Sequence, residues 1–309
     1  MTEQLKLKLN DSKATRWGAL VIVAFTMMAA YYVNDVVAPL KTMLETDLAW
    51  SSTDFGFFTG GYSFLNVFFL MLIWGGLILD RFGIRFTGKL ATILMVGGTA
   101  LEYYAMTGLA GADATLFGIN EIFGYKTGVF VAFAGYSIFG VGAEVAGITV
   151  SKIIAKWFKG KELATAMGVQ VALARIGSQA GYAVAIPLAR AFGISTPVLL
   201  GLVLLLGGMI AFFIFAVMDK KLDKQMEAAA IAAGTEDEEE KFSFKDVKNI
   251  LVNPGFWLIA LLCVLFYSCV FPFQKFASEL MIIKYGINEN VAGTFAGLPA
   301  LGALILTPV

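Results

Sequence analysis

The stretch GGLILDRFGIRFTGK, residues 75–89, decides the fold of this chain. One acidic and two basic side chains, Asp80, Arg81 and Arg85, surround Gly83 in a short turn, and long apolar segments flank the turn on both sides. Turns rich in arginine and lysine between apolar segments are typical of the cytoplasmic side of helical membrane proteins. The stretch therefore predicts a turn between two membrane-spanning helices.

The composition extends this prediction to the whole chain. Of its 309 residues, 58% are hydrophobic and only 15% are charged, and the mean hydropathy is +0.77. A soluble domain carries roughly 25% charged residues. At least seven stretches have the ~20 apolar residues that cross a bilayer as a helix, and they lack the period-two alternation of membrane β-strands. We therefore expect an all-α, multi-pass membrane protein.

Several functional classes are not expected. The net charge is zero, so the charge balance points to no nucleic-acid partner. The chain has no histidine, and Cys263 and Cys269 lie six residues apart in one apolar stretch, where they are expected to pack as small apolar side chains. Because no nucleophile–base set, metal cluster or phosphate loop is recognisable, we expect no enzyme, no cofactor and no metal. No obligate protein partner is evident.

The apolar stretches predict the organisation of the chain. A polar tail (residues 1–16) precedes six helices within residues 17–218, a polar loop over residues 219–253, and the start of a second bundle, residues 254–309. The expected helices are Trp17–Leu40, Asp54–Leu79, Phe86–Leu109, Thr127–Val150, Leu163–Leu188, Ile194–Met218, Phe256 to about Phe276, and one from about Asn290.

This order is the plan of a transporter built from two helical bundles. The second bundle would hold only two helices, so we expect the chain to be truncated, and a fragment is the simplest explanation. The acidic run Glu236–Glu240 in the long loop is expected to be a solvated linker, the alternative being a ligand-binding segment.

The basic residues predict the orientation. Seventeen lysines and arginines fall on the side of the N-terminal tail, and five fall on the other side: Lys41, Lys126, Arg190, Lys275 and Lys284. Since lysine and arginine accumulate in cytoplasmic loops, the N-terminus and the long loop are expected in the cytoplasm.

The turn quoted above resembles the signature loop of the major facilitator superfamily, through Gly76, Asp80, Arg81, Gly83 and Arg85. One additional residue separates the last two. The resemblance implies the fold of that superfamily and a role for these residues in gating at the cytoplasmic side. A small Gly76 would let its helix approach a neighbour closely, and Asp80 would pair with a basic group across the interface of the two bundles.

Two charges stand alone in apolar stretches, Glu144 within residues 127–150 and Arg175 within residues 163–188. A charge in the hydrocarbon is costly, so it persists where it faces the interior of the protein or a watery cavity. A carboxylate accepts hydrogen bonds from an ammonium group, and a guanidinium donates two parallel bonds to a carboxylate. An acid and a base on consecutive helices therefore predict a site for a solute that carries both charges.

The same helices resemble the major facilitator superfamily domain-containing protein 1 family, whose animal members are lysosomal dipeptide transporters. The matching motifs are WFKGKEL (residues 157–163) and ARIGS (residues 174–178), with looser agreement at residues 62–69, 80–85 and 253–273. The resemblance implies that Glu144 and Arg175 hold the amino and carboxyl ends of a dipeptide, and that transport is facilitated diffusion without an ion. The alternative is a buried ion pair between the two side chains that joins their helices.

Five further residues are weaker candidates for the site: Tyr32, Asp35, Asn66, Gln170 and Tyr267. Each has a structural alternative. Asp35 can line the cavity or lie near the outer surface, while Asn66 and Gln170 can hydrogen-bond a peptide backbone or join helices. Tyr267 can line the cavity or belong to an ordinary aromatic core.

The sequence thus predicts an alternating-access transporter of dipeptides or similar small zwitterions. One alternative is a proton-coupled symporter of organic anions, with Arg175 binding the anion and Glu144 carrying the proton. Another is a membrane receptor of the same fold that transports nothing. Because the N-terminal tail has no acidic dileucine signal, the plasma (inner) membrane is expected rather than the lysosome.

Overall fold

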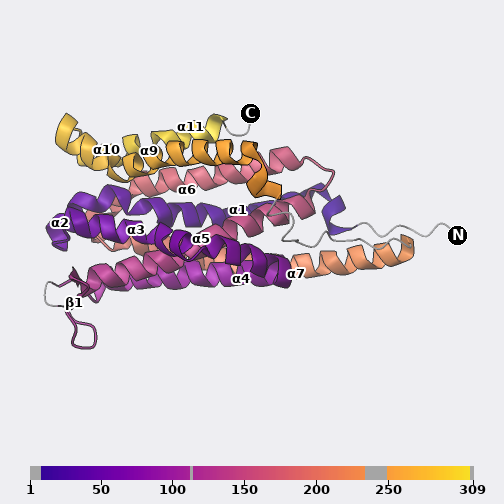
Figure 1. Ribbon diagram of the computed structural model, residues 1–309, viewed down its shortest axis with the longest axis horizontal. Helices are drawn as coiled ribbons and strands as arrows, with labels where there is room; N and C mark the ends of the chain where they lie inside the picture. Colours follow the sequence, from indigo (N-terminus) through magenta and orange to yellow (C-terminus); the bar gives the residue numbers. More distant parts are fainter. Residues whose placement is uncertain (1–7, 112–113, 234–248, 307–309) are drawn as a thin grey trace.

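The computed structural model describes residues 8–111, 114–233 and 249–306. Most of its long helices lie side by side along one direction (Figure 1). The expected all-α architecture is confirmed. The helices of the first bundle are α1 (Lys13–Val36), α2 (Lys41–Asp47), α3 (Ser52–Phe68), α4 (Met71–Thr107), α5 (Thr127–Trp157), α6 (Leu163–Phe192) and α7 (Thr196–Ala233). Short 3-10 turns, η1 (Leu9–Asp11) and η2 (Ala38–Leu40), flank α1.

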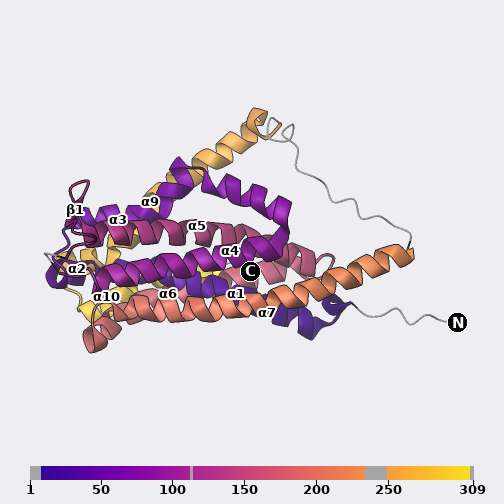
Figure 2. The same ribbon diagram turned by 90° about the horizontal axis from the view of Figure 1, so that it is seen from below.

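The two ends of the first bundle differ in character. One end carries a small antiparallel hairpin of β1 (Glu121–Ile122) and β2 (Tyr125–Lys126), and we call it the hairpin end. The other carries η1, the turn between α5 and α6, and the end of α7, and we call it the basic end (Figures 1 and 2).

Several helices are long and apolar enough to cross a membrane. By length and hydropathy, α1 with α2, α5, α7 and α9 (Pro254–Tyr285) qualify, and the pair α3 and α4, bent by 58°, adds a fifth span. The sequence predicted at least seven spans. The structure gives fewer by this criterion, because α4 joins the end of the second expected helix to the third, and the α3–α4 pair counts as one span. The 30-residue α6 is also long enough, but Gln170, Arg175 and Gln179 lower its hydropathy.

The signature turn lies inside α4. Gly83 has φ +75° and ψ 173°, and this non-helical residue separates the end of the second expected helix from the third. That backbone region is accessible essentially to glycine alone. A Cβ atom at this position would meet no neighbour within 4 Å, so conformation rather than space requires the glycine.

We therefore expect Gly83→Ala to lower the free energy of unfolding by roughly 1–3 kcal/mol, the cost of a strained backbone conformation. Thermal unfolding of the purified protein measures the change. Gly76→Ala is the matched control, because Gly76 is helical and a Cβ atom there also meets nothing within 4 Å. Alanine is favoured over glycine in helices, so the control should be neutral or stabilising. Equal destabilisation by both substitutions would contradict the assignment.

Among the described residues, nothing lies within 4 Å of a Cβ atom added at Gly76, the glycine expected to pack closely. Its neighbour Gly75 faces α5, where an added Cβ atom would lie 2.6 Å from Cγ2 of Val145. Successive helical residues are about 100° apart, so the two neighbouring glycines cannot both face α5.

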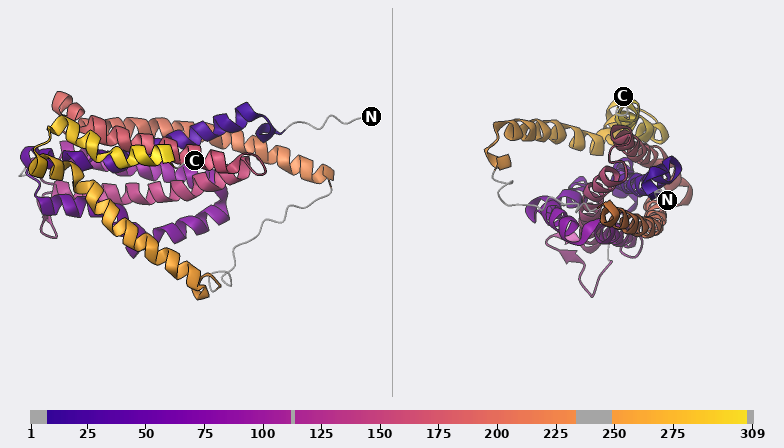
Figure 3. Two further views of the ribbon diagram at one scale, coloured as in Figure 1. Left: turned by 90° about the horizontal axis from the view of Figure 1, so that it is seen from above. Right: turned by 90° about the vertical axis from the view of Figure 1, so that its right-hand side faces the viewer.

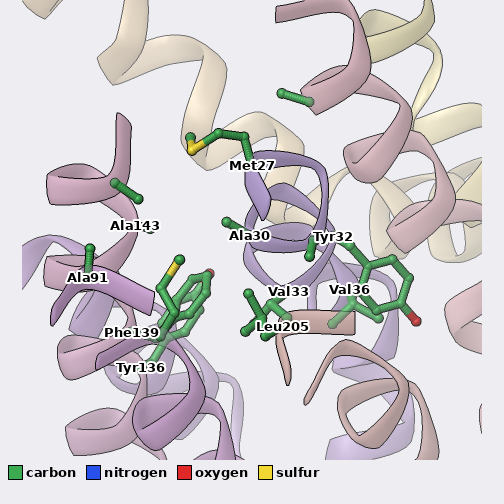
Figure 4. Packing of buried hydrophobic residues seen from close by; sticks show 14 of the residues in the cluster. Met27, Ala30, Tyr32, Val33, Val36, Ala91, Tyr136, Phe139, Ala143 and Leu205 are labelled. Atoms are coloured by element: carbon green, nitrogen blue, oxygen red, sulfur yellow. The ribbon is translucent and has the colours of Figure 1, made fainter. Parts of the chain in front are cut away.

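Small residues bring the helices of the first bundle together. At Gly98 of α4 and Gly135 of α5, an added Cβ atom would lie 2.5 Å and 2.6 Å from the carbonyl oxygen of the other residue. At Gly177 of α6, it would lie 2.0 Å from the carbonyl oxygen of Met28 in α1. Such contacts are typical of helix packing in membranes, where lipid supplies no hydrophobic drive for association. Figure 4 shows the core between them, with Met27, Ala30, Tyr32, Val33, Val36, Ala91, Tyr136, Phe139, Ala143 and Leu205.

Two helix ends differ from the sequence prediction. α5 continues past Val150 to Trp157, which places Glu144 near the middle of the helix. α7 continues to Ala233, so residues 219–233 are helical rather than part of a loop. The acidic run of the predicted linker lies outside the described residues.

The second bundle begins with α9, followed by α10 (Glu289–Ala296) and α11 (Leu298–Leu306). The end of α9 and α10 pack against the first bundle at the hairpin end, whereas the start of α9 lies far from it at the basic end (Figures 2 and 3). An added Cβ atom at Gly293 of α10 would lie 2.3 Å from the carbonyl oxygen of Tyr182 in α6. The described part of the second bundle therefore contacts the first bundle at the hairpin end, while the start of α9 lies away from it toward the basic end.

Candidate functional site

Glu144 lies near the middle of α5 and is half-buried. Its Oε1 atom accepts a hydrogen bond of 2.7 Å from the hydroxyl of Tyr62 in α3. This hydroxyl holds the carboxylate in one orientation. A carboxylate has further lone pairs, so Glu144 can still accept bonds from a ligand while it is held.

Arg175 lies on α6, and its guanidinium carbon is 5.3 Å from the ring centroid of Tyr31 in α1. This is a cation–π contact, which orients the planar guanidinium against the ring. Its Nε atom is buried without a hydrogen-bond partner among the described residues. A buried donor without a partner is costly, so this side chain is prepared to bind an acceptor.

The ion pair that the sequence left open does not form in this structure. Within the described residues, neither Glu144 nor Arg175 takes part in a salt bridge. Both charges, together with Asp35 and Tyr267, lie within electrostatic range of the Tyr31 hydroxyl. The two opposite charges thus share one region of the interior without neutralising each other, and each rests against a tyrosine.

The two predicted site residues of α1, Tyr32 and Asp35, have different surroundings in the structure. Tyr32 is buried and points to α7, where its hydroxyl donates to the carbonyl oxygen of Pro197 at 3.2 Å. Its neighbour Tyr31 occupies the position against Arg175. Asp35 is buried; it accepts from the Asn34 amide at 2.8 Å and lies near a lysine of α9 rather than beside Glu144 or Arg175.

The remaining predicted site residues, Asn66, Gln170 and Tyr267, form no described hydrogen bond with the side chain of Glu144 or Arg175. Asn66 donates to the carbonyl oxygen of Tyr62 one turn earlier in α3, at 3.1 Å, and its Oδ1 atom is buried without a described partner. Gln170 is half-buried on α6, five residues before Arg175. Tyr267 of α9 is exposed and stacks on Phe271, with ring centroids 5.0 Å apart.

The signature turn is tied to the first bundle in this conformation. Asp80 accepts from Lys152 of α5 at 2.8 Å, rather than pairing across the bundle interface as expected. Arg85 reaches α7, where it pairs with Asp219 at 3.3 Å and also with Asp223. The Arg81 guanidinium lies 5.5 Å from the ring centroid of Phe82. Among the described residues, no side chain of the second bundle pairs with Asp80.

The sequence analysis missed the partners of Arg85, because it assigned Asp219 to a loop. Asp219 is fully buried and accepts from Lys156 at 2.7 Å and from the Trp157 indole at 3.0 Å. Asp223 lies one helical turn further and shares Lys156. The signal was present, since acids four residues apart fall on one face of a continuing helix.

A second ion-pair group fastens the N-terminal segment to the turn between α5 and α6. Arg16 donates to Glu162 at 2.9 Å and holds the pKa of that carboxyl below its ordinary value. Lys161 donates to Asp11 at 2.6 Å and likewise lowers the pKa of that carboxyl. These contacts make the basic end of the first bundle one connected unit.

The helices of this protein pack through small residues around a glycine-centred basic turn, and Glu144 and Arg175 lie near the middle of two long helices. These are features of a membrane transporter. A sequence profile of the Major Facilitator Superfamily matches residues 20–309, so the chain belongs to that superfamily. It is a multi-pass integral membrane protein.

Among named proteins, the chain is similar to lysosomal dipeptide transporters called MFSD1. It is 26% identical to those of Homo sapiens and Pongo abelii, over 96% and 94% of this chain and 60% and 59% of theirs. The relative from Danio rerio is 27% identical over 87% of this chain and 55% of its own length. The chain therefore spans about 60% of the length of the first of these relatives.

Proposed function

We propose that this protein is a secondary transporter that moves dipeptides or similar small zwitterions. Glu144 holds the substrate ammonium group and Arg175 holds its carboxylate. The observation that carries the proposal is the pair of opposite charges on α5 and α6, each oriented by a tyrosine and neither in a salt bridge. The name of the MFSD1 relatives supports the dipeptide as the substrate class.

The chemistry explains a preference for dipeptides. Two charges fixed on rigid helices act as a gauge, because each end of the substrate must reach its partner. A single amino acid has its charges too close together to satisfy both sites, and a tripeptide exceeds the span. Leaving one buried charge without its partner costs several kcal/mol, which is the basis of the discrimination.

The transport cycle follows from the two bundle ends. We propose that the basic end faces the cytoplasm, as its lysines and arginines indicate. This structure then corresponds to a state open to the cytoplasm, with the hairpin end closed. Substrate is carried when the bundles rock about the fixed site, by facilitated diffusion without an ion. The name of the relatives points to a lysosome-like membrane, while the expectation of the plasma membrane stays a prediction.

Thermal stabilisation of the full-length protein tests the proposal, since a ligand that binds only the folded form raises its apparent stability. The panel consists of dipeptides, single amino acids, tripeptides and small organic acids such as lactate. We expect stabilisation by dipeptides alone. Uptake of a labelled dipeptide into liposomes with the purified protein should then exceed uptake into empty ones.

The same panel separates the alternatives. Stabilisation by organic acids, with no competition from dipeptides, would favour the proton-coupled anion symporter. Dipeptide binding without any flux above that of empty liposomes would favour a receptor of this fold.

A further inference from the structure

Lys275 of α9 crosses from the second bundle into the first. Its side chain is only 15% exposed. The ammonium donates to the carbonyl oxygen of Asn34 at 2.5 Å and to the Tyr136 hydroxyl at 3.1 Å, and it lies 3.8 Å from Oδ1 of Asp35. Its acceptors thus come from α1 and α5. The sequence analysis placed this lysine outside the membrane, but α9 continues to Tyr285 and the lysine lies in the interior.

Lys275 is the inner of two contacts on one face of α9. Glu279, one turn later, accepts from Lys41 at 2.5 Å, and Lys41 also bonds Glu45 at 2.7 Å. A further pair, Arg190 with Glu289, joins α6 to α10 and is more exposed. All three pairs link the bundles at the hairpin end. A charged contact of this kind is strong while dry and weakens when water enters between the bundles, so it can open and close.

The acceptors of Lys275 lead to the substrate site. The Tyr136 ring lies 5.7 Å from the ring of Tyr62, centroid to centroid. The Tyr62 hydroxyl donates to Glu144. A short chain of contacts therefore runs from Lys275 through Tyr136 and Tyr62 to Glu144.

A second connection follows α1. Asn34 and Asp35 lie one turn after Tyr31, whose ring is against Arg175. The contact at the hairpin end involves α1 and α5, and the two charges of the site are linked to the same helices: Glu144 belongs to α5, and Arg175 of α6 lies against Tyr31 of α1.

We propose that Lys275 is a positioning residue that couples occupancy of the substrate site to opening and closing at the hairpin end. The inference rests on the proposed function. A substrate ammonium that binds the free lone pairs of Glu144 draws the carboxylate toward the substrate, and the Tyr62 hydroxyl, which stays bonded to the carboxylate, is drawn with it. Tyr62 then shifts against Tyr136, which weakens the hold on Lys275 and lets the hairpin end open. Without substrate, the equilibrium favours the state in which the lysine is bound and the hairpin end is closed.

A spin-label distance measurement tests the coupling. In full-length protein whose native cysteines, Cys263 and Cys269 among them, are replaced by serine, labels on Asp47→Cys and Asn290→Cys report the separation of the bundles at the hairpin end, since both positions are exposed. We expect one short-distance population without ligand and a longer one when a dipeptide is added. Couplings of this kind change an equilibrium constant by roughly 5- to 150-fold.

Lys275→Gln removes the charge while keeping a similar length. It should raise the long-distance population without ligand and abolish the response of the distances to dipeptide. Thermal stabilisation by dipeptide should be retained, because the substrate site itself is unchanged. Lys275→Arg should restore the closed population. Lys284→Gln is the matched control, because Lys284 is exposed on the same helix.

Two results would overturn the proposal. One is a distance distribution of Lys275→Gln identical to that of the parent protein. The other is complete loss of dipeptide binding in that variant, which would make Lys275 a direct substrate contact. If no dipeptide binds even the parent protein, the proposed function fails, but the ligand-free distances still decide whether Lys275 holds the hairpin end closed.

Discussion

Arg175→Ala is expected to abolish the stabilisation of this protein by dipeptides. The substitution removes the guanidinium that donates two parallel bonds to the substrate carboxylate. A hydrogen bond to a charged group contributes roughly 1.5–3 kcal/mol, so the loss of two corresponds to at least about a hundredfold in Kd. Thermal unfolding at increasing dipeptide concentrations measures the loss, and liposome uptake should fall with it.

Two variants control for this result. Arg175→Lys keeps the positive charge but not the fork, so it should bind dipeptide more weakly than the parent and better than alanine. Tyr32→Phe removes only the hydroxyl that bonds Pro197, away from the site, and should bind as the parent does. Undiminished dipeptide stabilisation of Arg175→Ala would show that the guanidinium has a structural role only.

The sequence identified the two charges because the physics of the membrane leaves few explanations for them. A charge that interrupts an apolar stretch must face the interior, so Glu144 and Arg175 could be found without a structure. Glycine and basic residues likewise located the turn at Gly83, and the structure explains that glycine by its φ of +75°.

Other parts of the site depend on which face of a helix a residue occupies. Tyr31 and Tyr32 are adjacent and chemically equal, yet only the first meets Arg175, because the rotation of α1 is set by its packing. Lys275 resembled an ordinary flanking lysine because hydropathy ended its helix too early. Its buried acceptors come from two other helices, and no local pattern in α9 announces them.

Glu144→Gln is expected to remove the recognition of a free amino terminus. The parent protein should bind a dipeptide much more tightly than its N-acetylated analogue, which has no ammonium group. Glutamine keeps the shape of the side chain and an oxygen that accepts from Tyr62, but it has no charge. Removing one partner of a buried charge pair costs roughly 2–5 kcal/mol, so dipeptide affinity should fall at least about thirtyfold.

A crossed set of ligands distinguishes this role from the alternatives. Glu144→Gln should bind the free and acetylated dipeptides equally, and Arg175→Ala should be indifferent to amidation of the carboxyl end. Tyr62→Phe keeps the charge of Glu144, so it should preserve the preference for a free amino terminus. If Glu144→Gln instead keeps full dipeptide affinity and removes only a pH dependence of uptake, then Glu144 carries a proton and the protein is a symporter.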